Sequence, residues 1–273
     1  MPEGDTLHRI ADRLRPRLEG HRLVRFEAPR VTGYRPRPGD RIESVEAVGK
    51  HLLVRFERGI VLQTHLRMTG TWHLYRTGER WQRGAHRMRV LIAVDGWEAV
   101  CFDAPVVRTF VEGAQPSPVD HLGPDLCRED ADIDEAVRRM ATVADPDATI
   151  AEVLLDQRVS SGIGNVYKSE VLFACRLDPF TPLAAIDHDL RRRLIETAAR
   201  QLRANLGDGR RQTVPGGLAV YGRARRTCRV CGTPIRSRRH GAQPRVTYWC
   251  PRCQLPPPAP ASTTSPTTPT TGA

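Results

Sequence analysis

Four cysteines near the C-terminal end of the chain have the spacing of metal ligands. They form two Cys-x2-Cys pairs, Cys228 with Cys231 and Cys250 with Cys253, and eighteen residues separate the pairs. A Cys-x2-Cys segment can place two thiolates on one ion, and two such segments complete a tetrahedral Zn²⁺ site. We therefore predict one structural zinc ion, because four protein ligands leave no open position for catalysis. A redox-active pair and chance spacing are the alternative interpretations.

A glycine-rich turn is a second candidate site. Residues 160–165 read Ser-Ser-Gly-Ile-Gly-Asn and precede a segment with helical periodicity. Asn165 is a favourable N-cap, and backbone amides at a helix start can receive a phosphate group. A plain connector between two helices would explain the same residues, so the turn alone does not decide between binding and connection.

The charge of the chain is strongly positive and unevenly placed. Lysine and arginine together number 42 against 31 acidic residues, a net charge of +11, and Lys50 and Lys168 are the only lysines. Between residues 209 and 253 there are eleven arginines and no acidic residue. Such an excess predicts a polyanionic partner, and nucleic acid is the leading candidate.

The sequence also indicates the compartment. No apolar run reaches the roughly 18 residues of a membrane helix, and the N-terminus carries no secretory signal pattern. We therefore expect no membrane partner and a cytoplasmic location. Cysteines in such a compartment stay reduced, so we expect the remaining Cys101, Cys127 and Cys175 to be ordinary buried or half-buried thiols.

The elements that position these residues fall into two regions, and the first is rich in strands. Residues 5–18 carry apolar side chains at helical spacing, whereas residues 21–111 change to short alternating or apolar runs. An Asp-Gly pair separates the runs 89–94 and 97–102, which is a strong hairpin signal. Several strands at short spacing favour a β-sandwich.

The second region is helical and ends in a basic hairpin. Helical periodicity covers four segments, 132–144, 149–159, 165–175 and 187–206. Between the cysteine pairs, residues 234–249 are typical of a β-hairpin, and a basic hairpin held by zinc is a common nucleic-acid probe. Its arginines are Arg236, Arg238, Arg239 and Arg245.

Composition sets the outer boundaries. The last twenty residues contain no charge, six prolines and six threonines, and such a segment cannot bury enough surface to become ordered. We therefore predict a helix and β-sandwich domain over 1–115, a helical domain over 130–215, a zinc finger over 216–254 and a disordered tail over 255–273.

Taken in order, the motifs resemble one family over almost the whole length to Gln254. It is the formamidopyrimidine-DNA glycosylase and endonuclease VIII family of base-excision repair enzymes. The matching segments are Pro2-Glu3-Gly4, Gly49-Lys50-His51, Thr64-His65-Leu66-Arg67-Met68-Thr69-Gly70, Leu155-Asp156-Gln157 through Gly162-Ile163-Gly164-Asn165-Val166-Tyr167, Val220-Tyr221-Gly222-Arg223, and the four cysteines with Arg245 five residues before Cys250.

The resemblance implies an α+β fold and a bifunctional enzyme. Its architecture is an N-terminal helix and β-sandwich lobe, a helical lobe with a helix–two-turns–helix motif, and a C-terminal zinc-finger β-hairpin. Damaged double-stranded DNA would lie in the cleft between the lobes, and we expect a monomer. The activity would be that of a DNA glycosylase and abasic-site lyase.

The resemblance assigns the catalytic pair to Pro2 and Glu3. In such enzymes the secondary amine of the N-terminal proline, exposed once Met1 is removed, attacks C1′ of the damaged nucleotide. An α-amine has a pKa of about 7.7–8.0, so a useful fraction is neutral near pH 7. Glu3 would then act as general acid and base during formation of the Schiff base.

The resemblance also assigns residues that hold the DNA. Lys50 would grip a phosphate next to the lesion, and Arg245, at the tip of the zinc finger, would clamp the phosphates of the flipped nucleotide; with Pro2 and Glu3 they complete the predicted catalytic set. His65 and Asn165 would bind the same backbone, and Met68 would fill the space that the flipped base leaves. For Lys168, phosphate contact and an ordinary surface role both stay open.

Two departures from the formamidopyrimidine branch bear on the substrate. The Arg-Arg-Phe-Gly loop expected after an Asp-Pro is absent from Phe102–Arg108, and Asp5-Thr6 stands where many members have a Glu at position 6. These departures resemble the endonuclease VIII branch, which prefers oxidised pyrimidines. They leave open which residues stabilise the helix opposite the lesion.

Two other functions compete with this interpretation. A DNA-damage-binding protein of the same fold, with weak or no catalysis, would keep the basic cleft and zinc finger without a usable N-terminal amine. A zinc-ribbon protein of transcription or translation would have no use for the β-rich first region or the proline start. The intact Pro2-Glu3 pair favours the enzyme over both.

Overall fold

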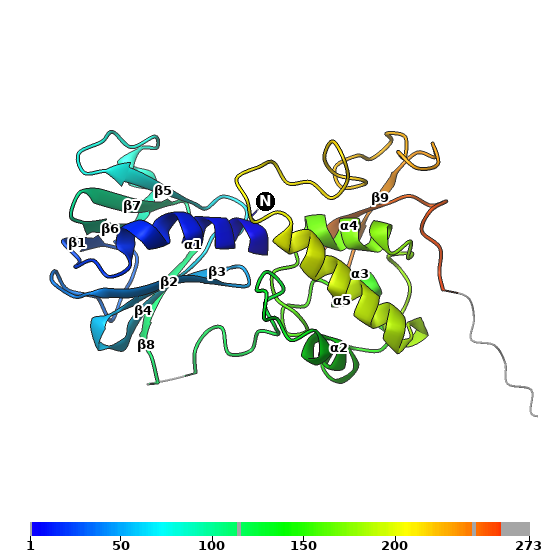
Figure 1. Ribbon diagram of the computed structural model, residues 1–273, viewed down its shortest axis with the longest axis horizontal. Helices are drawn as coiled ribbons and strands as arrows, with labels where there is room; N and C mark the ends of the chain where they lie inside the picture. Colours follow the sequence, from blue (N-terminus) through cyan, green and yellow to red (C-terminus); the bar gives the residue numbers. More distant parts are fainter. Residues whose placement is uncertain (1, 114–115, 242–243, 258–273) are drawn as a thin grey trace, which may run out of the picture.

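The computed structural model describes residues 2–113, 116–241 and 244–257, which form two lobes (Figure 1). The first lobe holds helix α1 (Gly4–Leu18) and two four-stranded antiparallel sheets. The second lobe holds the other helices and the C-terminal hairpin. In Figure 1 the first turn of α1 lies where the two lobes meet, so the fold brings the start of the chain to the junction between them.

The first lobe is the predicted sandwich. One sheet has the strand order β1-β6-β7-β5 and the other the order β2-β3-β4-β8. The Asp-Gly hairpin is confirmed, because β6 and β7 pair antiparallel with Val94 opposite Trp97. The strands are β1 (Arg25–Glu27), β2 (Ile42–Val48), β3 (His51–Phe56), β4 (Ile60–His65), β5 (Thr71–Arg76), β6 (Met88–Val94), β7 (Trp97–Phe102) and β8 (Val106–Val111), with short 3₁₀ turns η1 (Glu57–Gly59) and η2 (Ala85–Arg87).

Helix α1 lies against the sandwich along its predicted apolar stripe. Leu7, Ala11, Leu14 and Leu18 are buried in one core with apolar side chains of both sheets. Spacings of three and four residues bring these side chains to the same face of a helix. Their burial therefore fixes the direction of α1 and, with it, the position of the residues before its first turn.

The second lobe has its own apolar core, built by α2 (Ile133–Thr142), α3 (Ile150–Val153), α4 (Asn165–Ala174) and α5 (His188–Arg203). The segments predicted at 132–144, 165–175 and 187–206 are confirmed as α2, α4 and α5. A further 3₁₀ turn, η3 (Leu183–Ala185), precedes α5. The lobe therefore folds around side chains separate from those of the sandwich.

The helix predicted over 149–159 is too long, because α3 ends at Val153. The side chains of Asp156 and Gln157 explain the difference. Nε2 of Gln157 donates to the backbone oxygens of Leu155 and Ile163 at 2.8 and 3.1 Å, and its Oε1 accepts from the amide of Gly162 at 3.3 Å. Oδ1 of the neighbouring Asp156 also accepts from the amide of Arg158 at 2.9 Å, and an aspartate that bonds nearby backbone in this way favours a turn over a helix. Together the two side chains shape the segment that leads into α4.

The C-terminal hairpin is confirmed as β9 (Arg236–His240) and β10 (Arg245–Trp249), with Arg245 opposite His240. Phe180 of the helical lobe anchors it. The Phe180 ring lies edge-on to the rings of His240 and Trp249, with centroids 5.1 and 5.0 Å away, and the Arg238 guanidinium lies over its face at 3.8 Å. These contacts hold the hairpin against the second lobe.

The predicted tail begins with residues that still contact the helical lobe. The amide of Leu255 donates to the backbone oxygen of Arg176 at 3.2 Å, and its own oxygen accepts from the amide of Asp178 at 3.1 Å. Residues 258–273 of that predicted tail lie outside the described residues. Within the described ranges, no helix is both long and apolar enough to cross a membrane.

Candidate active site

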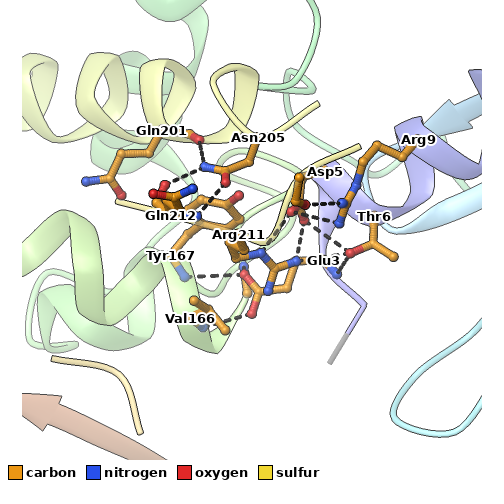
Figure 2. A network of polar contacts seen from close by, with 12 residues as sticks. Glu3, Asp5, Thr6, Arg9, Val166, Tyr167, Gln201, Asn205, Arg211 and Gln212 are labelled. Atoms are coloured by element: carbon orange, nitrogen blue, oxygen red, sulfur yellow. Dashed lines mark hydrogen bonds and ion pairs between the residues drawn. The ribbon is translucent and has the colours of Figure 1, made fainter. Parts of the chain in front are cut away.

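Glu3 is the centre of a buried polar site at the junction of the lobes (Figure 2). Its carboxylate accepts hydrogen bonds from three backbone amides at the start of α4: Gly164 at 2.9 Å, Val166 at 2.8 Å and Tyr167 at 3.3 Å. The Glu3 side chain is fully buried. Free amides at a helix N-terminus stabilise an anion, so a carboxylate from the first lobe binds the first turn of a helix in the second.

This arrangement corrects the prediction for the glycine-rich turn. Asn165 is not the N-cap but the first residue of α4, and Gly164 occupies the cap position without a side-chain hydrogen bond. The amides expected to receive a phosphate bind the Glu3 carboxylate instead. Glycine is required at 164 because a Cβ there would lie 2.3 Å from Cδ of Glu3.

The surroundings of Glu3 suit proton transfer. Burial is the largest influence and raises the pKa of the Glu3 carboxyl above its ordinary value, while the charges of Arg211 and Lys50 and the amides of Val166 and Tyr167 oppose that rise. A carboxyl with a raised pKa holds its proton closer to neutral pH. Glu3 can therefore serve as an acid in one step and as a base in the next.

Pro2 is half-buried and directly precedes Glu3. The residue on the other side of Glu3 is tightly held, because the amide of Gly4 donates to the oxygen of Gly162 at 2.9 Å. A Cβ on Gly4 would lie 2.7 Å from Cα of Gly162, so only glycine permits this approach. Pro2 thus directly precedes two residues, Glu3 and Gly4, that are both held against the second lobe. The predicted removal of Met1 concerns a residue outside the described ranges.

Arg211 is a site residue that the sequence analysis missed. Its Nε donates to Oδ2 of the buried Asp5 at 2.8 Å, and its Nη2 donates to Oγ1 of Thr6 at 3.0 Å. Asn205 pins the loop that carries it, because its side chain exchanges hydrogen bonds of 2.8 and 2.7 Å with the backbone of Gln212. Figure 2 shows the Arg211 side chain beside Glu3, Asp5 and Thr6. Nothing in the sequence distinguishes Arg211 from the other arginines of its basic segment.

Lys50 lies on a turn that Asp125 holds in place. One oxygen of Asp125 accepts from the amide of Gly49 at 2.8 Å and lies 2.8 Å from Nε2 of His8 on α1. Burial lowers the pKa of Lys50 to about 8, with Glu3 raising it and Arg245 lowering it further. Asp125, which sequence reasoning also missed, therefore ties α1, the lysine turn and the second lobe together.

His65 is neutral and has a defined tautomer. Burial, with the charges of Lys50 and Arg67, lowers its pKa to about 4. Its Nδ1 accepts from the amide of Arg67 at 3.1 Å, so the ring proton is on Nε2, which can donate to an anion. His51, a neighbour not assigned a role from the sequence, lies edge-on with its ring centroid 4.7 Å away, and its pKa is lowered to about 3, chiefly by burial.

Asn165 and Lys168 join α4 to the hairpin. The Asn165 amide donates to the oxygen of Val246 at 2.9 Å, and Lys168 Nζ donates to Asn165 Oδ1 at 2.7 Å and to Thr247 Oγ1 at 2.8 Å. Lys168 is 1 % exposed, and burial lowers its pKa to about 8. Lys168 is thus a buried part of the site, and it fixes the strand segment directly after Arg245.

Arg245 and Met68 are the exposed members of the predicted set. The charge of Arg245 lowers the pKa of both Lys50 and Lys168, so these three cations share one region. Met68 is 63 % exposed on the turn after β4. Gly70 closes that turn, with its amide donating to the oxygen of Leu66 at 2.9 Å. The structure therefore presents the Met68 side chain to solvent on a closed turn.

The predicted zinc ligands come together. The four sulfurs lie within 4.8 Å of one another, with 3.9 Å between Cys228 and Cys253 and 3.4 Å between Cys231 and Cys250. A tetrahedron of Zn–S bonds of about 2.3 Å has sulfur–sulfur edges of about 3.8 Å. The amide of Val230 also donates to the sulfur of Cys228 at 3.4 Å. The donor set therefore fits one Zn²⁺ ion.

Comparisons with known proteins agree with this geometry. Residues 1–110 match the model of the formamidopyrimidine-DNA glycosylase N-terminal domain, and residues 122–214 match that of the formamidopyrimidine-DNA glycosylase H2TH domain. The chain is 40 % identical to the probable endonuclease 8 2 of Streptomyces coelicolor, covering 94 % of this chain and 95 % of that one. The chain belongs to the formamidopyrimidine-DNA glycosylase and endonuclease VIII family.

Further relatives place it on the endonuclease VIII branch of this family. It is 36 % identical to the DNA-(apurinic or apyrimidinic site) lyase Nei2 of Mycolicibacterium smegmatis, with 93 % of this chain and 99 % of that one covered. The formamidopyrimidine-DNA glycosylase MutM of Thermus thermophilus has the same fold, with a TM-score of 0.76, 28 % identity and coverage of 94 % and 100 %. The predicted family, branch and fold are thus confirmed.

The structure also shows what replaces the missing loop of the formamidopyrimidine branch. Asp103 makes a tight turn with a positive φ of 54°, and β8 begins at Val106. Arg108 lies inside β8, where it is exposed and pairs with Gln63 of β4. The segment is therefore a short turn and a strand, and the arginines beside it come from elsewhere in the chain.

Proposed function

We propose that the protein is a base-excision-repair DNA glycosylase and abasic-site lyase that uses Pro2 as nucleophile. The observation that carries this proposal is the buried Glu3 carboxylate, which is bound to the first turn of α4 directly beside the proline. A carboxyl held next to a secondary amine, with the cations of Arg211 and Lys50 nearby, has the geometry of an acid–base partner.

The chemistry follows from the amine. The neutral nitrogen of Pro2 attacks C1′ of the damaged nucleotide, the glycosidic bond breaks, and the base leaves with a proton. The amine loses its own proton, and opening of the sugar ring gives an iminium. The iminium acts as an electron sink, so the 3′ and then the 5′ phosphate can leave by β- and δ-elimination.

Glu3 supplies and removes the protons of these steps. Protonated, it can protonate the ring oxygen of the sugar as the ring opens; ionised, it can accept the proton that the amine loses. Burial raises the pKa of this carboxyl above its ordinary value and so favours its protonated form, whereas the nearby cations and amides favour the ionised form. The three amides of α4 hold the carboxylate in one orientation during both steps.

The cations and the exposed residues around Glu3 would hold the DNA. We assign Lys50, Arg245 and the Nε2 proton of His65 to phosphates of the damaged strand, and Asn165 to the same backbone. The solved structure of the Lactococcus lactis enzyme bound to DNA containing an abasic site has the same fold, with a TM-score of 0.78 at 22 % identity. Met68 would enter the space vacated by the flipped base.

The proposal also covers the metal, the preferred bases, the oligomeric state and the compartment. Cys228, Cys231, Cys250 and Cys253 would hold one structural Zn²⁺, which would stiffen the base of the hairpin and would take no part in the reaction. We propose oxidised pyrimidines as the preferred bases, in keeping with the endonuclease VIII branch. We also propose that the protein acts as a monomer on double-stranded DNA in the cytoplasm.

Borohydride trapping tests the mechanism. Untagged protein is incubated with duplex DNA holding one thymine glycol, and any adduct is mapped by mass spectrometry. An adduct on Pro2 supports both the nucleophile and the substrate class, whereas an adduct only with 8-oxoguanine DNA would move the substrate class. No adduct with any lesion or abasic site, from folded and zinc-loaded protein lacking Met1, would leave a damage-binding protein as the better description.

A further inference from the structure

Asp103 gathers two arginines beside the turn that carries Met68. Its carboxylate lies 2.7 Å from a guanidinium nitrogen of Arg83 and 2.7 Å from one of Arg87. The Asp103 backbone oxygen accepts from Oγ1 of Thr69 at 3.1 Å, and its amide donates to the oxygen of Arg87 at 3.0 Å. Three segments far apart in the sequence are thus joined at one point.

The strand register places this cluster at the end of the sandwich that also carries Lys50. In one sheet Phe102 pairs with both Thr71 and Met88, so the turns before Thr71, before Met88 and after Phe102 leave the same end. In the other sheet His51 and Val106 both pair with His65 at the end next to Lys50. The turns 66–70 and 103–105 connect these two ends directly. The two arginines and Lys50 therefore lie at the same end of the sandwich, where the turn that carries Met68 links the two sheets.

The cluster has the chemistry of a phosphate site. Two guanidinium groups share one carboxylate, so its net charge is positive, and the Arg87 side chain is 46 % exposed. Asp103 already fixes the orientation of Arg87, because Arg87 Nε donates to both oxygens of the carboxylate at 3.0 and 2.9 Å. An arginine held in this way presents its remaining N–H groups to an anion with little loss of side-chain freedom.

We propose that Arg83 and Arg87 bind backbone phosphates of the strand opposite the damaged one. This inference rests on the proposed function, in which Lys50 and His65 hold the damaged strand and Met68 enters the duplex. A side chain inserted into the base stack has one backbone on either side of it. Lys50 and His65 come from the sheet on one side of the Met68 turn, and the arginine cluster comes from the sheet on the other side.

Binding of Arg87→Ala to duplex DNA with a stable abasic-site analogue tests this proposal. We expect the dissociation constant to rise about tenfold, and the slope of its logarithm against the logarithm of salt concentration to fall by about one. The duplex-to-single-strand affinity ratio should fall as well. Arg87→Lys keeps the positive charge but loses the forked guanidinium group, so its dissociation constant should lie between those of the wild type and Arg87→Ala. Equal melting temperatures would show that the variants are folded.

Arg22→Ala is the matched control. Arg22 is also exposed and also makes one ion pair, 3.9 Å from Glu57, but it lies at the far end of the sandwich beside η1. It should bind like the wild type, apart from the small effect of one lost distant charge. If Arg87→Ala and Arg22→Ala have the same affinity and the same salt slope, the proposal is wrong.

Neutral methylphosphonates identify the strand. Placed opposite the lesion in the complementary strand, they should weaken the wild type and remove its advantage over Arg87→Ala. If the affinity difference between the wild type and Arg87→Ala disappears only with methylphosphonates in the damaged strand, the arginines bind the damaged strand and the proposal is wrong. Because these are binding measurements, they stay informative even if Pro2 forms no adduct, which would instead contradict the proposed function.

Discussion

Replacement of Gly164 by alanine tests the anchoring of Glu3 with a single methyl group. The new Cβ would lie 2.3 Å from Cδ of Glu3, whereas unstrained carbon atoms approach to about 3.5–4.0 Å. The Glu3 carboxyl must therefore retreat by about 1.2 Å or more. The backbone at Gly164 has a φ of −123°, which alanine adopts without strain, so the effect comes from the collision alone.

The displacement breaks the hydrogen bonds that define the site. Bonds of 2.9 Å from Gly164 and 2.8 Å from Val166 would lengthen beyond the 3.5 Å at which they cease to contribute. Loss of two bonds to a buried carboxylate costs about 3 kcal/mol of unfolding free energy. A shift of about 1 Å in a catalytic group lowers the rate by about 100-fold.

Single-turnover cleavage of an abasic-site duplex, with the melting temperature measured in parallel, provides the assay. We expect Gly164→Ala to melt several degrees lower and to cleave about 100-fold more slowly. Gly209→Ala is the control, because a Cβ there meets no atom within 4 Å. A folded Gly164→Ala protein that cleaves at the rate of Gly209→Ala would refute the role assigned to the carboxylate.

Three further predictions concern the cations and the metal. Lys50 and Lys168 have pKa values of about 8 and carry their charges below that pH. The affinity for duplex DNA, measured by fluorescence anisotropy, should therefore fall as pH rises from 7 to 9, and it should fall less steeply in Lys168→Met, in which only Lys50 of the two lysines still titrates. A flat wild-type profile would contradict the assignment of Lys50 to a phosphate and the place of the Lys168 charge in the site. Cys250→Ser should release zinc and weaken DNA binding, and unchanged metal content by elemental analysis would exclude that ligand. Arg245→Ala should raise the dissociation constant for lesion DNA about tenfold without lowering the melting temperature, because Arg245 is exposed; a wild-type constant would remove its role at the hairpin tip.

Local patterns in the sequence were sufficient to predict most of the helices and strands and the clustering of the four cysteines. The apolar spacing of α1, the Asp-Gly hairpin and the paired cysteines each depend on residues close together in the chain. Helix periodicity failed only at 149–159, where the side chains of Asp156 and Gln157 bond the backbone of a turn. Such competition depends on side-chain geometry, which a periodic pattern does not contain.

Glu3, Lys50 and Asn165, which were named through the family resemblance, lie near the junction of the two lobes, but their partners were not visible in the sequence. Lys50 depends on Asp125, 75 positions further along the chain, and the sequence marks that aspartate only as one acid in an acid-rich segment. The role of Lys168 stayed open in the sequence, because a buried lysine and a surface lysine look the same in a sequence. Burial decides between them, and burial is a property of the whole fold.

The sequence by itself determined the family, the order of the elements, the four cysteines that cluster and the presence of a proline and a glutamate at the start of the chain. Only the tertiary structure decided what that glutamate contacts, because its hydrogen-bond donors lie 161 to 164 residues away. The tertiary structure likewise decided that Arg211 pairs with Asp5 and that Arg83 and Arg87 pair with Asp103. Electrostatic and hydrogen-bond energies depend on distances of a few ångströms, and those distances exist only once the two lobes have packed together.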